Sequence, residues 1–313
     1  MILKDNAVES NKGSYRISTE YLKSNMRRDI ITKIIEFLFF LCALVGVVSL
    51  IAIIGFVFYK GLSPFIGKNA YSIKEFLTGT RWAPSEGLYG IFYMIVGSVM
   101  STIGAIIVGV PLGILTAVYI AELANKRVAM IMKSTVELLA GIPSILYGAF
   151  GLGIIVPFLM RISPRVQGQS MFAVIIILTI MILPTIISLS ESAMRAVPRA
   201  YYAASMGLGA SKMQTIFKVM IPAAKSGILQ ATILGIGRAI GETMAVMMIA
   251  GNPTGGLPSS IWSMIRPLTT NIAMEMSYAS GRQSDMLFAT GVVLFIFIMI
   301  INFTMLKIVR KDS

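Results

Sequence analysis

The chain has 313 residues, of which 56% are hydrophobic and 13% are charged, and its net charge is +13. Because a soluble domain usually has about 25% charged residues, this composition excludes an ordinary soluble protein. The sequence contains no histidine and a single cysteine, Cys42, which excludes Ser-His-Asp catalysis, histidine-ligated metals, Cys-x-x-Cys redox chemistry and internal disulfides.

Six apolar runs are long enough to cross the hydrocarbon core of a bilayer. Backbone polar groups in lipid must be satisfied within the segment, so these runs are predicted to be helices. The predicted transmembrane helices cover residues 31–59, 88–120, 136–160, 171–189, 227–250 and 286–306. The second is too long for one straight crossing, and Gly109, Pro111 and Gly113 predict a bend or break within it. The predicted fold class is an all-α membrane protein with six transmembrane helices.

The polar segments between these helices define the domain organisation. The first apolar run is too long for a cleaved signal peptide, so we expect it to be retained. If both termini are cytoplasmic, 18 Lys and Arg residues lie on the cytoplasmic side and 8 outside, as the positive-inside rule requires. The sequence therefore predicts cytoplasmic termini, and the positive charge reflects topology, with no nucleic acid implied. The predicted segments are a cytoplasmic tail (1–30), the first helix (31–59), an external loop (60–87), a five-helix domain (88–308) with a cytoplasmic loop at about 190–225, and a cytoplasmic tail (309–313).

The strongest candidate site lies in the fifth predicted helix, where Arg238 and Glu242 occupy the middle of an apolar run. A charge at that depth costs about 2.5–3.5 kcal/mol on insertion scales, so intramembrane charges are usually functional. Positions i and i+4 share a helical face, so the two side chains are predicted to pair. Gly237 and Gly241 have the same spacing and would admit a neighbouring helix.

Two interpretations of this pair remain open. In the first, the guanidinium of Arg238 binds an oxyanion and Glu242 partly neutralises it when the site is empty. Arg238, Glu242 and the adjacent Thr243 are then residues of a substrate pathway. In the second, the pair is structural and only joins helices.

The main cytoplasmic loop has a helix–glycine–helix pattern. Residues 203–206 are predicted to be helical, Gly207 and Gly209 interrupt the helix, and Pro222 ends a second short helix that carries Lys212 and Lys218. Such an element suits docking into a groove on a soluble partner, although an ordinary amphipathic surface helix has the same pattern.

No nucleotide-binding motif is visible in the sequence. The run from Gly61 to Lys68 has five residues between its glycines and Asn69 after the lysine, whereas a P-loop needs four residues and a Ser or Thr. Any use of ATP therefore requires another subunit. The sequence offers no catalytic residue, no metal site and no cofactor site.

The same segments carry a family resemblance. The cytoplasmic loop resembles the EAA loop of bacterial ABC-importer permeases, which reads Glu-Ala-Ala, three residues, Gly, nine residues and Ile-x-Leu-Pro. Aligned on Gly209, this chain has Ala203-Ala204-Ser205 and then Val219-Met220-Ile221-Pro222, so the spacing matches and Ala203 replaces the glutamate. The segments GRAIGETMAV (237–246) and ELLAGIPSILYG (137–148) look like those of phosphate-importer permeases. Trp82-Ala83-Pro84 followed by Tyr89-Gly90-Ile91 resembles the PstC type more than its PstA-type partner.

The resemblance covers about residues 76–313 and implies a type I ABC-importer permease fold in the bacterial inner membrane. The implied partners are a homologous PstA-type permease, two copies of a cytoplasmic PstB-type ATPase and an external PstS-type phosphate-binding protein, with phosphate as substrate and membrane lipid around the helices. It also implies an ATPase coupling loop that includes Ala203, Ala204, Ser205, Gly209, Ile221 and Pro222. A PstA-like permease, a permease for another oxyanion, an ion-coupled secondary transporter and a membrane-bound enzyme or sensor remain as alternatives.

Overall fold

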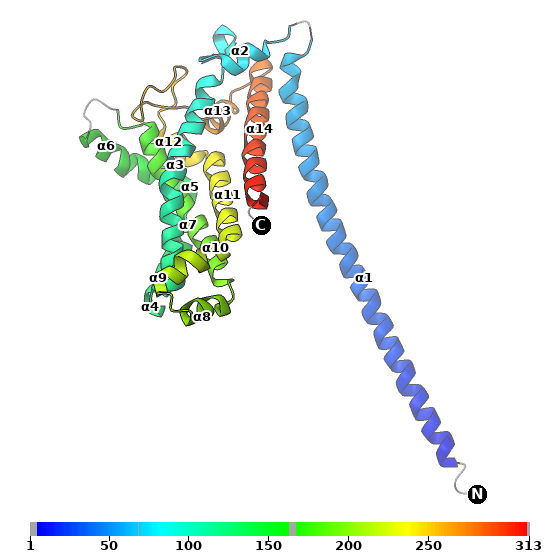
Figure 1. The fold of residues 1–313 in the computed structure, drawn as a ribbon. Coiled ribbons are helices and arrows are strands. Elements are labelled where there is room, and N and C mark those ends of the chain that lie inside the picture. The colour runs from blue at the N-terminus through cyan, green and yellow to red at the C-terminus, as the bar shows by residue number, and fades with distance from the viewer. Residues whose placement is uncertain (1–4, 68, 163–166, 312–313) are drawn as a thin grey trace. The chain divides into compact units, whose positions relative to one another are not determined.

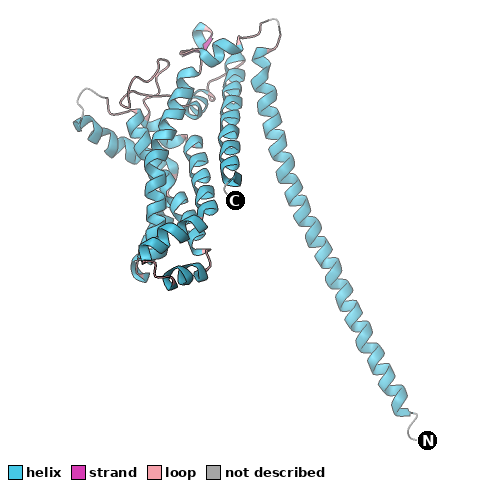
Figure 2. Cartoon of the chain, in the orientation of Figure 1, coloured by secondary structure: helices cyan, strands magenta, loops and turns pink. Residues whose placement is uncertain are grey.

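A computed structural model describes the backbone of residues 5–67, 69–162 and 167–311, and most side chains between residues 31 and 307. Nearly all of the described chain is helical, apart from loops and one short β-hairpin (Figure 2). The chain divides into two compact units, one ending at Phe56 and the other beginning at Val57. The prediction of an all-α membrane protein is confirmed, with the hairpin as its one exception among the described residues.

The first unit is a single helix that continues into the second unit. Helix α1 covers Asp5–Leu62, and from Ile31 onward it is long and apolar enough to cross a membrane. The helical backbone begins at Asp5, within the predicted tail of residues 1–30, and the candidate membrane span within α1 begins at Ile31. The Lys, Arg and Glu residues of this segment favour helix about as well as the apolar residues do. Residues 1–4 of the predicted tail lie outside the described residues.

In the second unit, long helices run beside one another (Figure 1). Among the described residues, five helices of the chain are long and apolar enough to cross a membrane, and a sixth crossing is obtained if the bent pair 212–223 and 225–241 is one span. The two halves of that pair meet at 69°. The main helices of the unit are α3 (Phe92–Val118), α7 (Met171–Arg195), α11 (Lys225–Gly241) and α14 (Arg282–Lys311).

Helix α3 corrects the second predicted span in two respects. It begins at Phe92, since Leu88 belongs to the hairpin, and it continues unbroken through Pro111 to Val118. Its glycines have a packing role instead of a breaking one. A Cβ atom on Gly109 would lie 2.6 Å from Ile182 of α7, and one on Gly113 would lie 2.7 Å from Ile186. The glycines therefore let α3 lie close against α7.

The third predicted span is corrected in a similar way. Residues 136–141 belong to a separate helix, α4 (Lys126–Gly141), which ends before Pro143. Proline disfavours helical conformation in the residue before it, which accounts for the extended backbone of Ile142. The candidate membrane span begins only at Ser144. It consists of α5 (Ser144–Phe150), the π-helical turn η4 (Gly151–Ile155) and α6 (Val156–Ile162).

Short elements cover both ends of the second unit (Figure 1). One end carries η1 (Ser63–Phe65), α2 (Ile73–Thr78), the hairpin of β1 (Trp82–Ala83) and β2 (Leu88–Tyr89) joined by η2 (Pro84–Glu86), and α13 (Leu268–Glu275). The opposite end carries the π-helical turn η3 (Tyr119–Leu123), α4, α8 (Arg199–Gly207), α9 (Lys212–Thr215), the π-helical turn η5 (Ile216–Met220) and α10 (Ile221–Ala223).

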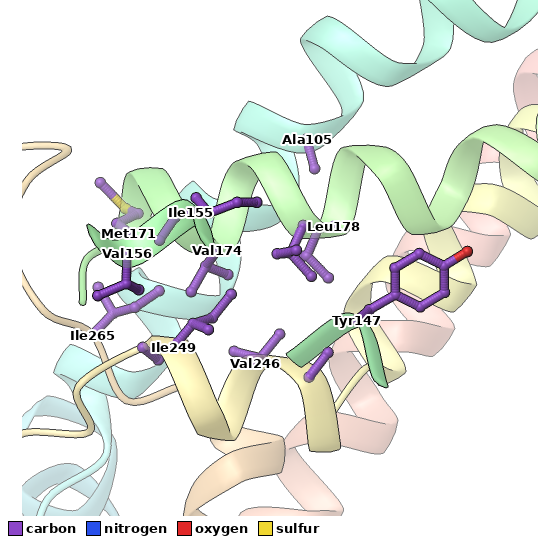
Figure 3. Close-up of a cluster of buried hydrophobic side chains, with 14 of the residues drawn as sticks. Ala105, Tyr147, Ile155, Val156, Met171, Val174, Leu178, Val246, Ile249 and Ile265 are labelled. Atoms are coloured by element: carbon purple, nitrogen blue, oxygen red, sulfur yellow. The ribbon is translucent and has the colours of Figure 1, made fainter. Parts of the chain in front are cut away.

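Helix α7 lies at the centre of the packing. Figure 3 shows Val174 and Leu178 of α7 in one apolar cluster with Val246 and Ile249, which come from α12 (Met244–Ile249). Ile155 of η4 also belongs to this cluster (Figure 3). The later part of α7 packs in separate apolar clusters, with Ile182 and Ile186 in one, Ile187 in a second and Met194 in a third.

Candidate substrate pathway and coupling element

The fifth predicted span is broken in the middle of its motif. Helix α11 ends at Gly241, Glu242 has an extended backbone (φ −68°, ψ 130°), and α12 starts at Met244. Three polar contacts stabilise the break. The Glu242 carboxylate accepts the backbone N–H of Ala245 at 3.1 Å, the Thr269 hydroxyl of α13 donates to the Glu242 carbonyl at 3.1 Å, and the Thr243 hydroxyl donates to the Gly241 carbonyl at 3.2 Å.

The break overturns the predicted pairing of Arg238 with Glu242. The prediction assumed one continuous helix, but the helix ends before Glu242, so i and i+4 no longer share a face. Among the described residues no ion pair joins the two side chains. Glu242 instead caps the start of α12, which satisfies a free N–H of that helix.

Arg238 contacts a neutral group. Its Nη1 donates to the Thr185 hydroxyl of α7 at 3.3 Å. The side chain is half-buried and lies in α11, the second half of the bent pair that is counted as a possible membrane span.

Gly237 and Gly241 do not serve a helix contact within the described part of the chain. A Cβ atom on either glycine would find nothing within 4 Å. By contrast, a Cβ on Gly235 would lie 2.7 Å from Ile186 of α7. Helix α11 therefore packs on α7 through Gly235, and the face that carries Gly237 and Gly241 is open in this chain.

The coupling element, which we define as residues 199–223, has the predicted helix–glycine–helix form. Ala203, Ala204 and Ser205 lie in α8, Gly209 has a positive φ of 87° that favours glycine, and Ile221 and Pro222 lie in α10. Ser211 and Gln214 form a capping box at the start of α9. The hydroxyls of Ser205 and Thr215 are 2.9 Å apart and join α8 to α9.

Contacts that the sequence did not reveal connect this element to the bundle. Arg199, the first residue of α8, donates to both carboxylate oxygens of Glu122 at 2.9 and 3.3 Å, and the Glu122 side chain is only 3% exposed. Nearby, Glu191 of α7 is equally buried and interacts with Lys133 and Arg195. In the sequence, these ion pairs are indicated only by Glu122 and Glu191, each of which lies just beyond the end of an apolar run.

The fold has the features of a multi-pass permease subunit: several membrane-crossing helices and a segment of short helices between two of them. The family described as binding-protein-dependent transport system inner membrane component matches residues 109–312. The chain belongs to this family of ABC-importer permeases.

Individual relatives agree with the family. The chain is 36% identical to the probable ABC transporter permease protein YqgH of Bacillus subtilis, over 94% of this chain and 97% of the relative. It is 32% identical to the phosphate transport system permease protein PstC of Pasteurella multocida, over 76% and 81% of the two chains. Among solved structures, a bacterial alginate ABC transporter matches with a TM-score of 0.67 at 15% identity, covering 91% of this chain and 96% of that chain. The MetNI methionine ABC transporter matches with a TM-score of 0.53 at 23% identity, covering 72% and 94%.

Family membership fixes the general role. The chain is a multi-pass inner-membrane permease subunit of an ABC importer. The ATP that drives such an importer is hydrolysed by a separate subunit. ABC importers of this kind also use a partner permease and a binding protein. The alternatives of a secondary transporter or a membrane enzyme are therefore set aside.

Proposed function

We propose that the chain is the PstC-type permease subunit of an ATP-driven phosphate importer. Its 32% identity to a PstC permease over 76% of the chain supports the substrate. The observation that carries the proposal is the guanidinium of Arg238, which is half-buried within a membrane-spanning helix and has no carboxylate partner among the described residues.

An unpaired guanidinium at this depth suits an oxyanion. Arginine has five N–H donors in a planar fork that matches phosphate oxygens, and among the described residues only one of them has a protein acceptor, the neutral Thr185 hydroxyl. A passing phosphate supplies both the missing negative charge and the missing acceptors. Glu242 and Thr243 lie at the helix break beside it, where the Glu242 carboxylate limits how tightly an anion binds.

The topology follows the charge distribution. The end with α4 and α8 faces the cytoplasm together with both termini, which places the excess of Lys and Arg inside. The end with the hairpin and α13 faces outward and receives the PstS-type binding protein. A PstA-type permease completes the pathway, and two PstB-type ATPases bind below.

Phosphate uptake tests the proposal. Cells that lack this chain are complemented with wild type, Arg238→Ala or Arg127→Ala at matched membrane levels, and ATP-dependent uptake of labelled phosphate is measured. Arg127 is an exposed arginine of α4 and serves as the control. We expect wild type and Arg127→Ala to restore uptake, and Arg238→Ala to lose on the order of a hundredfold, since a hydrogen bond to a charged group contributes about 1.5–3 kcal/mol and the guanidinium makes more than one.

The possible failures have different meanings. If wild type restores nothing, uptake of sulfate and other oxyanions is measured next, because the substrate assignment is then wrong. If Arg238→Ala fails to co-purify with its partners, the residue has an assembly role and the pathway proposal fails. If the variant assembles and transports normally, Arg238 does not contact the substrate.

The coupling element is proposed to bind the ATPase. Leu208, at the end of α8, is 90% exposed. Two further apolar residues of the element are also exposed, Tyr201 at 54% and Met213 at 50%. Such large apolar residues on a basic surface suit a groove on a soluble subunit. Leu208→Asp is expected to reduce co-purification of the ATPase strongly, while Leu208→Met retains it. Equal ATPase recovery with both variants would contradict docking through α8.

A further inference from the structure

A cavity with both polar and apolar walls lies between α4 and α7, toward the end of the bundle that carries α8. Its volume is about 160 Å³. Its polar lining residues are Lys133 and Glu137 of α4 and Ser188, Glu191 and Ser192 of α7, and the apolar residues Ile120, Val136 and Ile187 complete the wall. Since one water molecule occupies about 30 Å³ of the liquid, the cavity has room for a small hydrated ion.

A line of hydroxyls on α7 connects this cavity with Arg238. Thr185, which accepts the hydrogen bond from Arg238, is followed at positions i+3 and i+7 by Ser188 and Ser192. This spacing places all three on one side of the helix. The distance along the axis from Thr185 to Ser192 is about 10 Å, at 1.5 Å per residue. Ser188 is half-buried and Ser192 is exposed, so this side of α7 is open.

The cavity contains unused hydrogen-bond donors. The Lys133 ammonium lies 3.5 Å from the Glu191 carboxylate, which also accepts from Arg195. An ammonium has three donors, so Lys133 retains two for a ligand. The Ser188 hydroxyl makes no hydrogen bond with the described residues. One buried carboxylate facing two cations leaves a net positive charge, which Glu137 at the cavity wall offsets.

We propose that this cavity is a second oxyanion subsite, which receives phosphate from Arg238 before its release at the α8 end. Lys133 and Ser188 donate to the anion, and Glu191 positions Lys133. Glu137 keeps the affinity low, so that the anion leaves. The proposal rests on the proposed phosphate import.

Inhibition by phosphate on the release side tests the subsite. The complete importer is reconstituted in vesicles, with ATP and increasing phosphate on the α8 side and labelled phosphate with its binding protein on the other side. We expect Lys133→Gln and Ser188→Ala to raise the half-inhibitory phosphate concentration on the order of threefold, as for the loss of a partly exposed contact. Glu137→Gln is expected to lower it by a similar factor, since it removes a repelling charge.

Two features separate a subsite from a structural network. Ser188→Ala leaves both ion pairs of Glu191 intact, so its effect reports a lost donor. Lys126→Gln removes an exposed cation from the same helix and is expected to leave inhibition unchanged. If Lys133→Gln, Ser188→Ala and Glu137→Gln are all inhibited at the wild-type concentration while importing phosphate, the subsite is refuted and the proposed function stands. If wild type does not import phosphate, both proposals fail.

The lipid composition distinguishes the source of the anion. The measurement is repeated in vesicles of phosphatidylcholine alone and in vesicles that also contain phosphatidylglycerol. A subsite for translocated phosphate gives the same shifts in both. Shifts that occur only with the anionic lipid would identify a lipid headgroup as the occupant and overturn the proposal.

Discussion

Helix α7 and the pair α11–α12 belong to the same bundle, and they differ in where the helix is interrupted. The helix that contains a proline is continuous, and the segment without a proline is broken. Helix α7 contains Pro184 and is continuous over 25 residues. The segment from Lys225 to Ile249 contains no proline and breaks at Glu242 and Thr243. In this protein the proline is tolerated and the charged motif interrupts the helix.

The difference lies in the partners available to the freed backbone groups. Pro184 is buried in α7, which packs against α3, α4 and α11, and close packing by neighbouring helices lets a membrane helix tolerate a proline. At the break between α11 and α12, the Glu242 carboxylate and the hydroxyls of Thr243 and Thr269 satisfy backbone groups directly. A membrane helix therefore breaks where side chains replace its hydrogen bonds, and the break leaves Arg238 at the end of α11 without Glu242.

The largest expected effect concerns the contact between the two helices. A Cβ atom on Gly227 of α11 would lie 2.5 Å from the Cβ of Ala193 of α7. Gly227→Ala is expected to push the helices apart and destabilise the subunit by about 1–3 kcal/mol, as in other overpacked sites. The thermal unfolding midpoint of the purified importer measures the change.

Gly237→Ala is the matched control for this substitution. It makes the same chemical change in the same helix but meets nothing within 4 Å. We expect no loss of stability, because alanine favours helix over glycine by up to about 1 kcal/mol. Equal destabilisation by the two substitutions would refute the assignment of the α7 contact to Gly227.

The next effect concerns the break itself. Glu242→Ala removes the acceptor for the Ala245 N–H and is expected to cost about 1 kcal/mol, as for other caps. Glu242→Gln keeps an acceptor and loses only the charge, so the stability is expected to remain near wild type while phosphate is held more tightly by Arg238. The unfolding midpoint measures the contribution of the Glu242 cap to stability, and the half-saturation of uptake measures the effect of its charge on phosphate binding. If Glu242→Ala and Glu242→Gln destabilise the subunit equally, the hydrogen bond from Glu242 to the Ala245 N–H does not stabilise the break.

The sequence predicted the helices better than their interruptions. Hydropathy correctly predicted that α7 starts at Met171. The glycines and Pro222 correctly predicted the helix–glycine–helix form of the coupling element. The glycines of α3 were misjudged, because close packing against Ile182 and Ile186 is a tertiary property that a single sequence does not show. The break at Glu242 was missed for the same reason, since one of its supports, Thr269, is 27 residues away. The contact between Arg238 and Thr185 spans 53 residues, and no local pattern encodes it.

The smallest expected effect concerns this last contact, which is the direct polar link between α7 and Arg238. Thr185→Val keeps the side-chain shape and removes the hydroxyl that accepts from the guanidinium at 3.3 Å. The bond from the charged guanidinium is long, and Thr185 acts on phosphate only by orienting Arg238. The half-saturation for phosphate is therefore expected to rise by only about two- to tenfold, at or below the low end for hydrogen bonds of charged groups. Thr185→Ser restores the acceptor and is expected to restore the half-saturation. Normal uptake by Thr185→Val would show that the orientation of Arg238 depends on the end of α11 and not on α7.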